Sequence, residues 1–457
     1  MFIGRENELA KIRKQLKPDR KAAILIYGKR RIGKTSIIQQ ACKDFDGIKI
    51  NHLCAKTSYE GNLALLARSV SMALNLPQLS FGTIFDLFDF LKKQDKHILL
   101  VLDEYQYFKE SLGENELDSY MQAILDSLPE NIKIILCGSY IAMMKELLKE
   151  QNPLFGRFTL ILNVEEFDYL DASSFYANLS VREKIRYYAV FGGSPFVLSK
   201  INYNIPFEAN ISELMMDQNS ILRSHIENVM LKEISRSYDI RIFEALGNGK
   251  KKYSEIASII GMSDTSLLDK QLKHLMNMQA LVKTFPINKP NDRKKQFYEI
   301  KDNLMRFYFK FVFGKDTLIS KFGEMLFAEN NVFAYINSFI SLRFEAIAMQ
   351  YFSRIAKKGM LKGVRDFGSY WYDDRKNARN GQFDCVLKTD DGYDFYEAKF
   401  YSRPMTLREC IQEEEQIRAI PGINCRNMGF ICSAGFEFSS EKYKLITADE
   451  MYSDELR

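Results

Sequence analysis

Eight residues near the start of the chain, from Gly28 to Thr35, follow the spacing G-x-x-x-x-G-K-T, in which each fixed position has a chemical duty. The glycines let backbone N–H groups close around a β-phosphate, and Lys34 reaches the β- and γ-phosphates. The hydroxyl of Thr35 is placed to ligate Mg²⁺. The pattern predicts a site for ATP and Mg²⁺ made by Gly28, Arg31, Ile32, Gly33, Lys34, Thr35 and Ser36.

The residues around this loop have the context that the chemistry needs. The apolar run from Ala22 to Tyr27 predicts a buried strand that leads into the loop. Residues 36–42 continue as a helix, whose N-terminus adds its dipole to a phosphate site.

A second apolar run, Ile98 to Leu102, ends in Asp103 and Glu104, which is the Walker B pattern. Asp103 would hold Mg²⁺ through water, and Glu104 would polarise the water that attacks the γ-phosphate. The alternative for the run alone is a buried strand that ends in a solvated acidic turn.

Two further residues could act on the γ-phosphate. Ser139 follows the predicted strand at 132–137 and is placed to sense the γ-phosphate or the attacking water; otherwise it caps the next helix. Arg157, in Pro-Leu-Phe-Gly-Arg, is a candidate arginine finger, and a surface salt bridge is the alternative.

Another set of chemical side chains lies near the C-terminus. Two predicted strands, 383–388 and 394–400, are joined by a turn at Asp390-Asp391-Gly392. Glu397 and Lys399 are two residues apart and point to one face, where Asp384 can meet them across the hairpin. Two carboxylates can bind a hard divalent cation, and the lysine can orient or acidify a metal-bound water for attack on phosphorus. The alternative is a cross-strand ion pair.

The elements that must position these residues follow from the apolar pattern. Strands at 22–27, 48–54, 98–102 and 132–137 alternate with predicted helices, which indicates a mostly parallel sheet covered on both faces. The helices are expected near 6–16, 34–43, 61–74, 83–93, 116–128 and 140–150. Ligands of such a sheet sit at the carboxyl ends of the strands, where the phosphate loop lies.

Beyond residue 168 the strands stop. Residues 170–235 read as helices interrupted at Gly192-Gly193-Ser194-Pro195. Helices at 239–247, 253–260 and 264–279, followed by strands at 281–285 and 296–300, predict a winged helix-turn-helix. Strands return in the region from 306 to the end, where a helix is expected at 406–418.

In the predicted recognition helix, 264–279, Leu268, Leu272 and Leu275 recur at helical spacing and belong to the core. Basic residues of this helix, of the segment before it and of the wing could meet the phosphates of DNA. These are Lys250, Lys251, Lys252, Lys270, Lys273, Arg293, Lys294 and Lys295. A packing module that transmits the nucleotide state is the alternative.

The composition is that of an ordinary globular protein. The 457 residues are 46% hydrophobic and 27% charged, with a net charge of +5, which is compatible with nucleic acid but equally with a solvated basic surface. The seven cysteines are scattered and form no C-x-x-C pair, which argues for a reducing cytoplasm and against a structural zinc site. No signal peptide or transmembrane helix is expected, because no uninterrupted apolar run approaches ~18 residues.

The order of motifs resembles the archaeal-type AAA+/STAND P-loop ATPases, which are signal-transduction NTPases with numerous domains. The resemblance rests on Phe2-Ile3-Gly4-Arg5-Glu6, the phosphate loop, Walker B, Pro-Leu-Phe-Gly-Arg and Gly193-Ser194-Pro195. It implies that Arg5 lies near the nucleotide, that Pro195 sits in a helical lid over the base, and that a winged helix follows the lid.

The C-terminal set resembles the PD-(D/E)xK nuclease superfamily, with Asp384, Glu397 and Lys399 as the motif residues. The resemblance implies that Glu345 is the helix-borne acid that completes the metal site, and that the helix with Gln412 and Gln416 follows the motif strand. Phe383 stands where that superfamily has its initial proline.

Together these features predict an α/β protein: a P-loop ATPase core (1–167), a helical lid (168–236), a winged helix-turn-helix (237–305) and a restriction-endonuclease-like domain (306–457). The expected activity is Mg²⁺-dependent ATP hydrolysis that controls a nuclease acting on nucleic acid, in a defence role that only the resemblance suggests. The alternative is an ATP-dependent regulator or scaffold with an inactive nuclease-like domain; a dedicated motor ranks below both. DNA is the expected partner besides ATP, no membrane is expected, and the sequence leaves the oligomeric state open.

Overall fold

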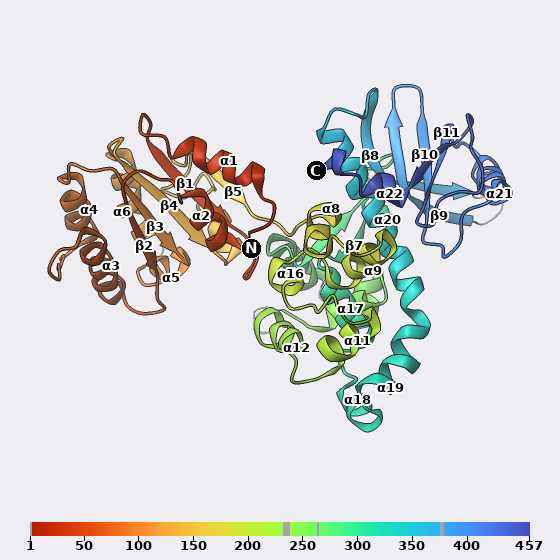
Figure 1. The fold of residues 1–457 in the computed structure, drawn as a ribbon, viewed down its shortest axis with the longest axis horizontal. Coiled ribbons are helices and arrows are strands. Elements are labelled where there is room, and N and C mark those ends of the chain that lie inside the picture. Colours follow the sequence, from red (N-terminus) through yellow and green to blue (C-terminus); the bar gives the residue numbers. More distant parts are fainter. Residues whose placement is uncertain (1, 114, 232–237, 263–264, 375–378) are drawn as a thin grey trace. The chain divides into compact units, whose positions relative to one another are not determined.

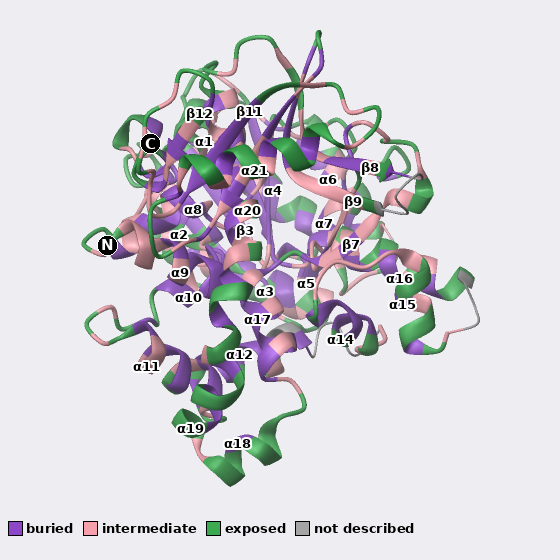
Figure 2. Ribbon diagram, turned by 90° about the vertical axis from the view of Figure 1, so that its right-hand side faces the viewer, coloured by how far each residue is buried: buried purple, intermediate pink, exposed green. Residues whose placement is uncertain are grey.

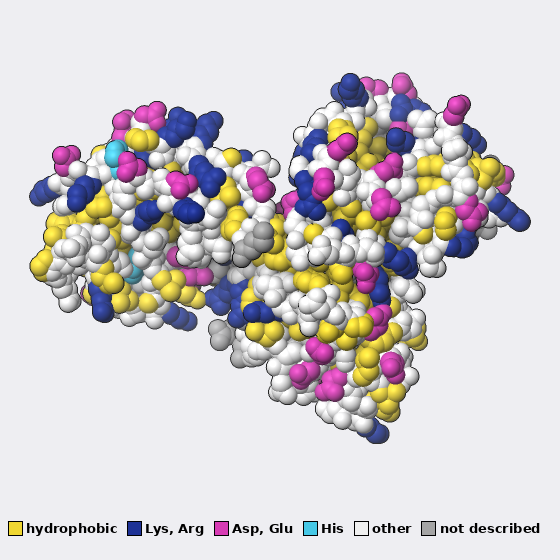
Figure 3. All heavy atoms as spheres, in the orientation of Figure 1, with side chains coloured by type: hydrophobic (Ala, Val, Ile, Leu, Met, Phe, Trp, Pro, Cys, Tyr) yellow, Lys and Arg dark blue, Asp and Glu magenta, His cyan; other side chains and the backbone are white. Residues whose placement is uncertain are grey.

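A computed structural model describes residues 2–113, 115–231, 238–262, 265–374 and 379–457 (Figure 1). The chain divides into two compact units, Met1–Glu166 and Phe167–Arg457. Each unit has its own hydrophobic cores. On the face drawn in Figure 3, basic and acidic side chains are interspersed within each unit, in keeping with the small net charge of +5.

The first unit is built on five parallel strands in the order β2-β3-β4-β1-β5. The strands are β1 (Ala22–Tyr27), β2 (Ile48–Leu53), β3 (Ile98–Asp103), β4 (Ile132–Gly138) and β5 (Leu160–Asn163). The three central strands are almost wholly buried, because helices cover both faces, and their side chains are apolar with few exceptions, such as Lys133 of β4, whose ammonium donates to the carbonyl of Glu130. The four predicted strands are confirmed, whereas β5 is an addition: this four-residue edge strand has a weak apolar pattern.

Helices cover both faces of this sheet. They are α1 (Glu6–Gln15), α2 (Lys34–Ala41), α3 (Tyr59–Leu74), α4 (Ile84–Lys92), α5 (Tyr105–Lys109), α6 (Glu116–Asp126) and α7 (Ile141–Glu146). Successive residues of β1 point to opposite sides. Ile24 packs with Ile12 of α1 and Ile37 of α2, while Leu25 packs with Leu66 of α3 and Leu87 of α4. Figure 2 shows the strands mostly buried and the outer surfaces of the helices exposed.

The second unit begins with short helices. They are α8 (Tyr169–Ala172), η1 (Ser173–Tyr176), α9 (Val181–Phe191), α10 (Pro195–Leu198), α11 (Phe207–Ile211), η2 (Ser212–Met216), α12 (Ile221–His225) and η3 (Ile226–Leu231). The predicted break is confirmed, since α9 ends at Gly192, which has a φ of 70°. A Cβ on Gly193 would lie 1.9 Å from the carbonyl oxygen of Phe167, so only glycine allows this close approach. The predicted boundary between residues 236 and 237 lies outside the described residues.

Three helices and a hairpin follow, at the ranges that the sequence predicts. They are α14 (Arg241–Gly247), α15 (Tyr253–Ile260), α16 (Thr265–Asn277), β6 (Leu281–Thr284), η4 (Arg293–Lys295) and β7 (Phe297–Ile300). Leu268, Leu272 and Leu275 are buried, which confirms them as core residues. We refer to residues 241–300 as the hairpin module.

The longest helix of the second unit is α20 (Ala334–Lys357). It follows α17 (Asn303–Phe311), α18 (Asp316–Phe322), α19 (Glu324–Ala328) and η5 (Glu329–Phe333). Among the described residues, one continuous helical stretch, Glu324–Lys357, is long and apolar enough to cross a membrane by length and composition alone. Polar residues interrupt this stretch, so it does not stand out in the sequence as an unbroken apolar run. Phe339, Phe344 and Phe352 of this stretch are buried in the hydrophobic core of the unit.

The C-terminal part contains a second five-stranded sheet in the order β12-β11-β10-β9-β8. Its strands are β8 (Val364–Asp374), β9 (Arg379–Thr389), β10 (Tyr393–Lys399), β11 (Cys425–Cys432) and β12 (Lys444–Thr447). The first three are antiparallel and the last three are parallel. Helix α20 packs on one face, and α21 (Leu407–Arg418) lies against the other with Cys410 and Ile417. The predicted hairpin and helix are confirmed; the chain ends with α22 (Ala448–Met451) and η6 (Asp454–Leu456).

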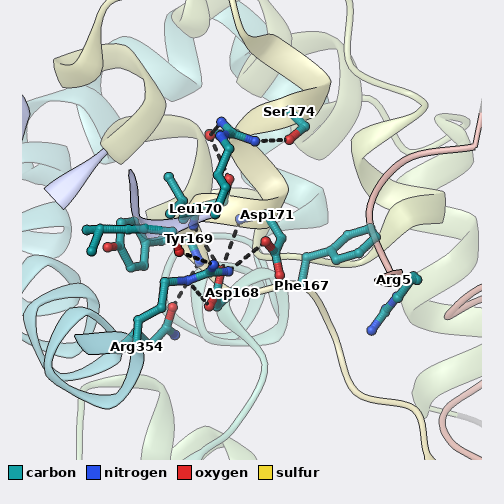
Figure 4. A network of polar contacts seen from close by, with 12 residues as sticks. Arg5, Phe167, Asp168, Tyr169, Leu170, Asp171, Ser174 and Arg354 are labelled. Atoms are coloured by element: carbon teal, nitrogen blue, oxygen red, sulfur yellow. Dashed lines mark hydrogen bonds and ion pairs between the residues drawn. The ribbon is translucent and has the colours of Figure 1, made fainter. Parts of the chain in front are cut away.

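A polar network ties the start of the second unit to α20 and to the C-terminus (Figure 4). Arg354 of α20 donates to both carboxylate oxygens of Asp168, at 2.9 and 2.7 Å, and pairs with Asp171 at 2.6 Å. It also donates to the carbonyl oxygen of Leu456 at 2.8 Å. The hydroxyl of Tyr169 donates to the carbonyl of Met451 at 2.6 Å. Helix α20 is thereby anchored at its C-terminal end.

Candidate functional site

The phosphate loop leaves β1 and enters α2 as the sequence predicts. Gly28 lies so close to the backbone of Val164 that an added Cβ would sit 2.3 Å from its carbonyl oxygen. Gly33 caps α2 with a φ of 91°, and Arg31 also has a positive φ, of 62°. These left-handed conformations turn the chain tightly between strand and helix, leaving the helix N-terminus open to an anion.

Lys34 is folded back over its own loop. Its side chain is buried, and Nζ donates to the carbonyl oxygens of Gly28 and Lys29, both at 2.9 Å. Burial lowers the pKa of this ammonium group, because water no longer stabilises its charge. A bound phosphate group would stabilise the charged form of Lys34 again, which suits a lysine that faces phosphates.

The two predicted magnesium ligands already face each other. The hydroxyl of Thr35, at the start of α2, donates to Oδ2 of Asp103 at 2.8 Å. The other carboxylate oxygen of Asp103 accepts from the backbone N–H of Glu104 at 2.9 Å. A hydroxyl and a carboxylate beside a phosphate loop are the oxygen donors that Mg²⁺ prefers, so these residues fit the cation.

Glu104 is held in one orientation by residues from β4 and α5. Its Oε2 accepts from the hydroxyl of Ser139 at 2.6 Å and from the backbone N–H of Ser139 at 3.3 Å. Gln106 also donates to this oxygen, and to the Ser139 hydroxyl at 3.3 Å. The alternative of Ser139 as a helix cap is wrong, since α7 has Tyr140 at its N-cap. Gln106 was not among the residues predicted from the sequence, although it lies only two residues after Glu104.

Arg157 lies in an ion pair. Its Nε and Nη2 donate to the two carboxylate oxygens of Asp126 at 2.9 and 3.1 Å, and Nη1 donates to the carbonyls of Pro153 and Phe155 at 2.8 and 3.2 Å. In this structure the guanidinium of Arg157 is therefore engaged in a salt bridge with Asp126. An action of Arg157 on a γ-phosphate stays a prediction.

The remaining nucleotide residues of the sequence analysis lie as follows. Arg5 is buried and donates to Glu8 at 3.0 Å and to the carbonyl of Glu165 at 2.6 Å, both within the first unit. Ser36 is exposed in the first turn of α2. Pro195 is the first residue of α10 in the second unit, so its predicted approach to the base stays a prediction.

The C-terminal set comes together on β9 and β10. Tyr396 is paired with Cys385, a register that carries Glu397 to the position opposite Asp384. Nζ of Lys399 lies 2.8 Å from Oε1 of Glu397. The same ammonium lies 2.9 Å from Oε1 of Glu413 on α21. Glu413 was missed, although the sequence analysis had singled out the helix that bears it; the predicted Gln412 and Gln416 are exposed there.

Asp384 has partners from two other elements. Its Oδ1 accepts from Nζ of Lys250, in the hairpin module, at 2.6 Å, and from Nε2 of Gln382 at 2.9 Å. Glu345 of α20 is hydrogen-bonded to Asp384 as well. The structure therefore brings together all four predicted residues of this site and adds Lys250, which sequence reasoning had assigned to DNA contact alone.

The carboxylates of this site repel each other. Burial, reinforced by Asp384 and Glu397, raises the pKa of Glu345 to about 8. Burial also raises the pKa of Glu397, against the opposing pull of Lys399. Among the described residues, no group of three or more His, Cys, Asp or Glu is arranged to hold a metal ion. The donor chemistry fits a hard cation, but a lysine ammonium supplies the positive charge beside Asp384 here.

The ionisation of Glu345 is expected to lower the free energy of unfolding as pH rises from about 4.5 to about 8. A carboxyl whose pKa is higher in the folded than in the unfolded state favours folding below its unfolded pKa and loses that advantage as it ionises. Glu345→Gln keeps the hydrogen-bonding capacity but cannot titrate, so the free energy of unfolding of this variant should depend less on pH. Urea unfolding in EDTA across this pH range measures it; parallel curves for the two proteins would contradict the assignment.

Comparison with known proteins covers most of the chain. A family model described as an ATPase domain predominantly from Archaea matches residues 2–201. A second, described as archaeal and bacterial proteins of unknown function, matches residues 308–415. An uncharacterized curated protein of Methanocaldococcus jannaschii is 27% identical over 397 residues, which are 86% of this chain and 85% of the relative.

Two solved structures are similar at a lower level. The Walker-type ATPase PABY2304 of Pyrococcus abyssi is 19% identical, with a TM-score of 0.46, over 68% of this chain and 96% of its own. The ORC2 protein of Aeropyrum pernix is 13% identical, with a TM-score of 0.43, over 67% of this chain and 92% of its own.

The family match agrees with the geometry of the first unit, where phosphate loop, Thr35, Asp103 and Glu104 converge at the carboxyl ends of parallel strands. The first part of this chain is therefore a P-loop ATPase domain, similar over residues 2–201 to ATPase domains found predominantly in Archaea, and residues 308–415 are similar to archaeal and bacterial proteins of unknown function.

Proposed function

We infer that the protein is a Mg²⁺-dependent ATP-hydrolysing switch that controls a C-terminal nuclease acting on nucleic acid. The observation that carries this proposal is that one chain brings together two sets of side chains suited to phosphate chemistry. In one, Thr35 and Asp103 face each other beside the phosphate loop; in the other, Asp384, Glu397 and Lys399 lie together. The hairpin module would be a winged helix, and the second sheet with its helices a restriction-endonuclease-like domain.

In the ATPase site each side chain has one task. Lys34 would leave the carbonyls of Gly28 and Lys29 for the β- and γ-phosphates. Thr35 and Asp103 would hold Mg²⁺, which neutralises charge developing on the phosphates when bound. Glu104, oriented by Ser139, would accept the proton of the attacking water.

In the nuclease site, Asp384, Glu397 and Glu345 would hold the divalent cation, which polarises a phosphodiester and activates water when bound. Lys399 would orient that water from its place between Glu397 and Glu413. Burial alone would lower the pKa of Lys399, but the charges of Glu397 and Glu413 outweigh that effect, raise the pKa and keep the ammonium protonated.

A chain of contacts suits the control of one site by the other. Within the first unit, Lys29 of the phosphate loop pairs with Glu166 at 3.1 Å. Two residues later in the chain, Asp168 pairs with Arg354 of α20 within the second unit. Glu345 lies nine residues before Arg354 on the same helix, so a shift of the loop on hydrolysis could reach the carboxylates through α20.

Calorimetry with Mg²⁺ and ATP tests the ATPase half of the proposal. The wild-type protein is expected to bind ATP, and Lys34→Ala should weaken binding by at least about 10²-fold, because the charge-assisted contacts to the phosphates are lost. Lys14→Ala, on an exposed part of α1, is the matched control. A wild-type protein without affinity for ATP would refute the proposal.

The second candidate function is an ATP-dependent regulator or scaffold whose nuclease-like segment is inactive. The observation in its favour is that Asp384 and Glu397 are each satisfied by a lysine, as in a structural ion-pair cluster. It predicts that Lys34→Ala changes partner binding, while no DNA or RNA is cleaved with Mg²⁺ or Mn²⁺. Assays on supercoiled and linear DNA and on RNA, with and without ATP, separate the two.

The setting of this activity belongs to the proposal too. A reducing cytoplasm suits the seven free cysteines. The proposal also divides the second unit into three parts, at residues 168–236, 237–305 and 306–457. It further includes assembly into an oligomer in which Arg157 acts on a neighbouring subunit.

A further inference from the structure

The hairpin module is docked on the sheet that carries the carboxylates. The β6–β7 loop lies along the edge strand β8, where the backbone N–H of Ile287 donates to the carbonyl of Ser369 at 2.7 Å. The amide of Asn288 exchanges two hydrogen bonds with the backbone of Trp371, at 2.8 and 3.0 Å. Phe297 of β7 stacks on Trp371 with ring centroids 6.1 Å apart. The module therefore covers an edge that would otherwise offer unpaired strand groups.

Three lysines of the module gather around this aromatic pair, and the charge of a fourth, Lys289, acts on one of them. Nζ of Lys295 lies 4.0 Å from the centroid of the Trp371 ring, and Nζ of Lys252 lies 5.0 Å from it. Nζ of Lys250 lies 5.8 Å from the Phe297 ring. Burial lowers the pKa of Lys295, and the charges of Lys252 and Lys289 lower it further, whereas Asp373 and Asp292 oppose them. These four residues, Lys250, Lys252, Lys289 and Lys295, are called the lysine cluster.

The lysine cluster ends at the carboxylate site. Lys251 pairs with Tyr298 of β7 through two backbone hydrogen bonds, of 3.0 and 2.8 Å, which fixes the neighbouring Lys250. The ammonium of Lys250 then lies 2.6 Å from Oδ1 of Asp384. Gathering like charges costs free energy unless an anion joins them. A surface that gathers these ammonium groups and brings one of them to the carboxylates is complementary to a polyanion.

We propose that the lysine cluster binds the sugar–phosphate backbone of a nucleic acid and guides one phosphodiester to Asp384 and Glu397. In this step Lys250 would leave Asp384 for a phosphate oxygen of the nucleic acid, which would free Asp384 to hold the divalent cation. This proposal rests on the proposed nuclease function and names how its substrate is held. The proposed contact with nucleic acid therefore lies in the lysine cluster and not on the predicted recognition helix α16, where Lys273 pairs with Asp269 at 2.7 Å.

The test is the binding of fluorescein-labelled DNA and RNA oligonucleotides to the full chain, measured by anisotropy in EDTA. Lys252→Ala/Lys295→Ala should weaken binding by about tenfold or more at 0.1 M salt, and should reduce the slope of log K against log salt by about 2, because two phosphate contacts are lost. Lys252→Arg/Lys295→Arg keeps both charges and should restore binding. This second variant separates loss of contact from misfolding.

Lys283→Ala is the matched control. Lys283 is paired with Tyr298 on the other face of the same hairpin from Phe297, so its loss should leave the affinity and the slope unchanged. An unchanged affinity and slope in the double alanine variant would overturn the proposal. Binding of polyglutamate, but not of nucleic acid, through the same lysines would overturn it too.

The outcomes also separate this proposal from the nuclease assignment. If the wild-type protein binds nucleic acid through the lysine cluster but cleaves none with Mg²⁺ or Mn²⁺, the binding surface stands and the nuclease assignment fails. If the wild-type protein and the double alanine variant bind and cleave equally well, the nuclease assignment stands and the lysine cluster as a binding surface fails.

Discussion

Glu104→Gln is expected to reduce ATP turnover by about 10²-fold or more while leaving the affinity for ATP within a few-fold of the wild-type value. The amide is isosteric and can still bond to Ser139, but it cannot accept a proton from water. Asp103, which contacts Thr35, is untouched by this change. Steady-state phosphate release gives the turnover, and calorimetry in the same buffer gives the affinity.

Two further variants interpret that result. Ser139→Ala removes the 2.6 Å hydrogen bond that orients Glu104, and should lower turnover by a smaller factor, of about 10, without changing the pH at which activity is half-maximal. Glu110→Gln, exposed at the end of α5, should have no effect. Full turnover in Glu104→Gln would remove Glu104 from the mechanism and leave only nucleotide binding to this site.

The second large effect is expected at the other end of the chain. Under the proposed nuclease function, Glu397→Ala should reduce Mg²⁺-dependent cleavage of DNA by on the order of a thousandfold, because the proposed ligand of the cation and the partner of Lys399 are lost together. ATP hydrolysis, which belongs to the first unit, should remain. Nicking of supercoiled DNA in the presence of ATP measures the effect.

Glu415→Ala is the matched control for this site, since Glu415 lies on the exposed side of α21, two residues after the Lys399 partner Glu413. Its cleavage rate should equal that of the wild-type protein. Equal cleavage by Glu397→Ala and the wild-type protein would show that any nuclease activity originates elsewhere, and would favour the scaffold function.

The elements that the sequence predicted correctly are those with a strong local pattern. Strand β1 is an unbroken apolar run, and Leu268, Leu272 and Leu275 recur at helical spacing, so neighbouring residues suffice to identify them. Edge strand β5 and the five-residue helix α5 were missed, because both are too short to show a period. The long apolar stretch of α20 was missed because polar residues interrupt it.

The catalytic candidates follow the same division. The amino-acid sequence by itself determined the phosphate loop, the Asp103-Glu104 pair and the strand-borne Glu397 and Lys399, because each is defined by a spacing along a few residues of backbone. Only the tertiary structure decided that Ser139 serves Glu104 and that Arg157 is paired with Asp126.

The same holds for the contacts across the second unit. Lys250 reaches Asp384 across 134 residues of chain, and Lys399 is shared with Glu413 of another helix. Such pairings depend on how elements far apart in the sequence pack, and burial then fixes which charges must neutralise each other. Local spacing therefore sets which chemistry the chain can perform, whereas packing sets which side chains support it.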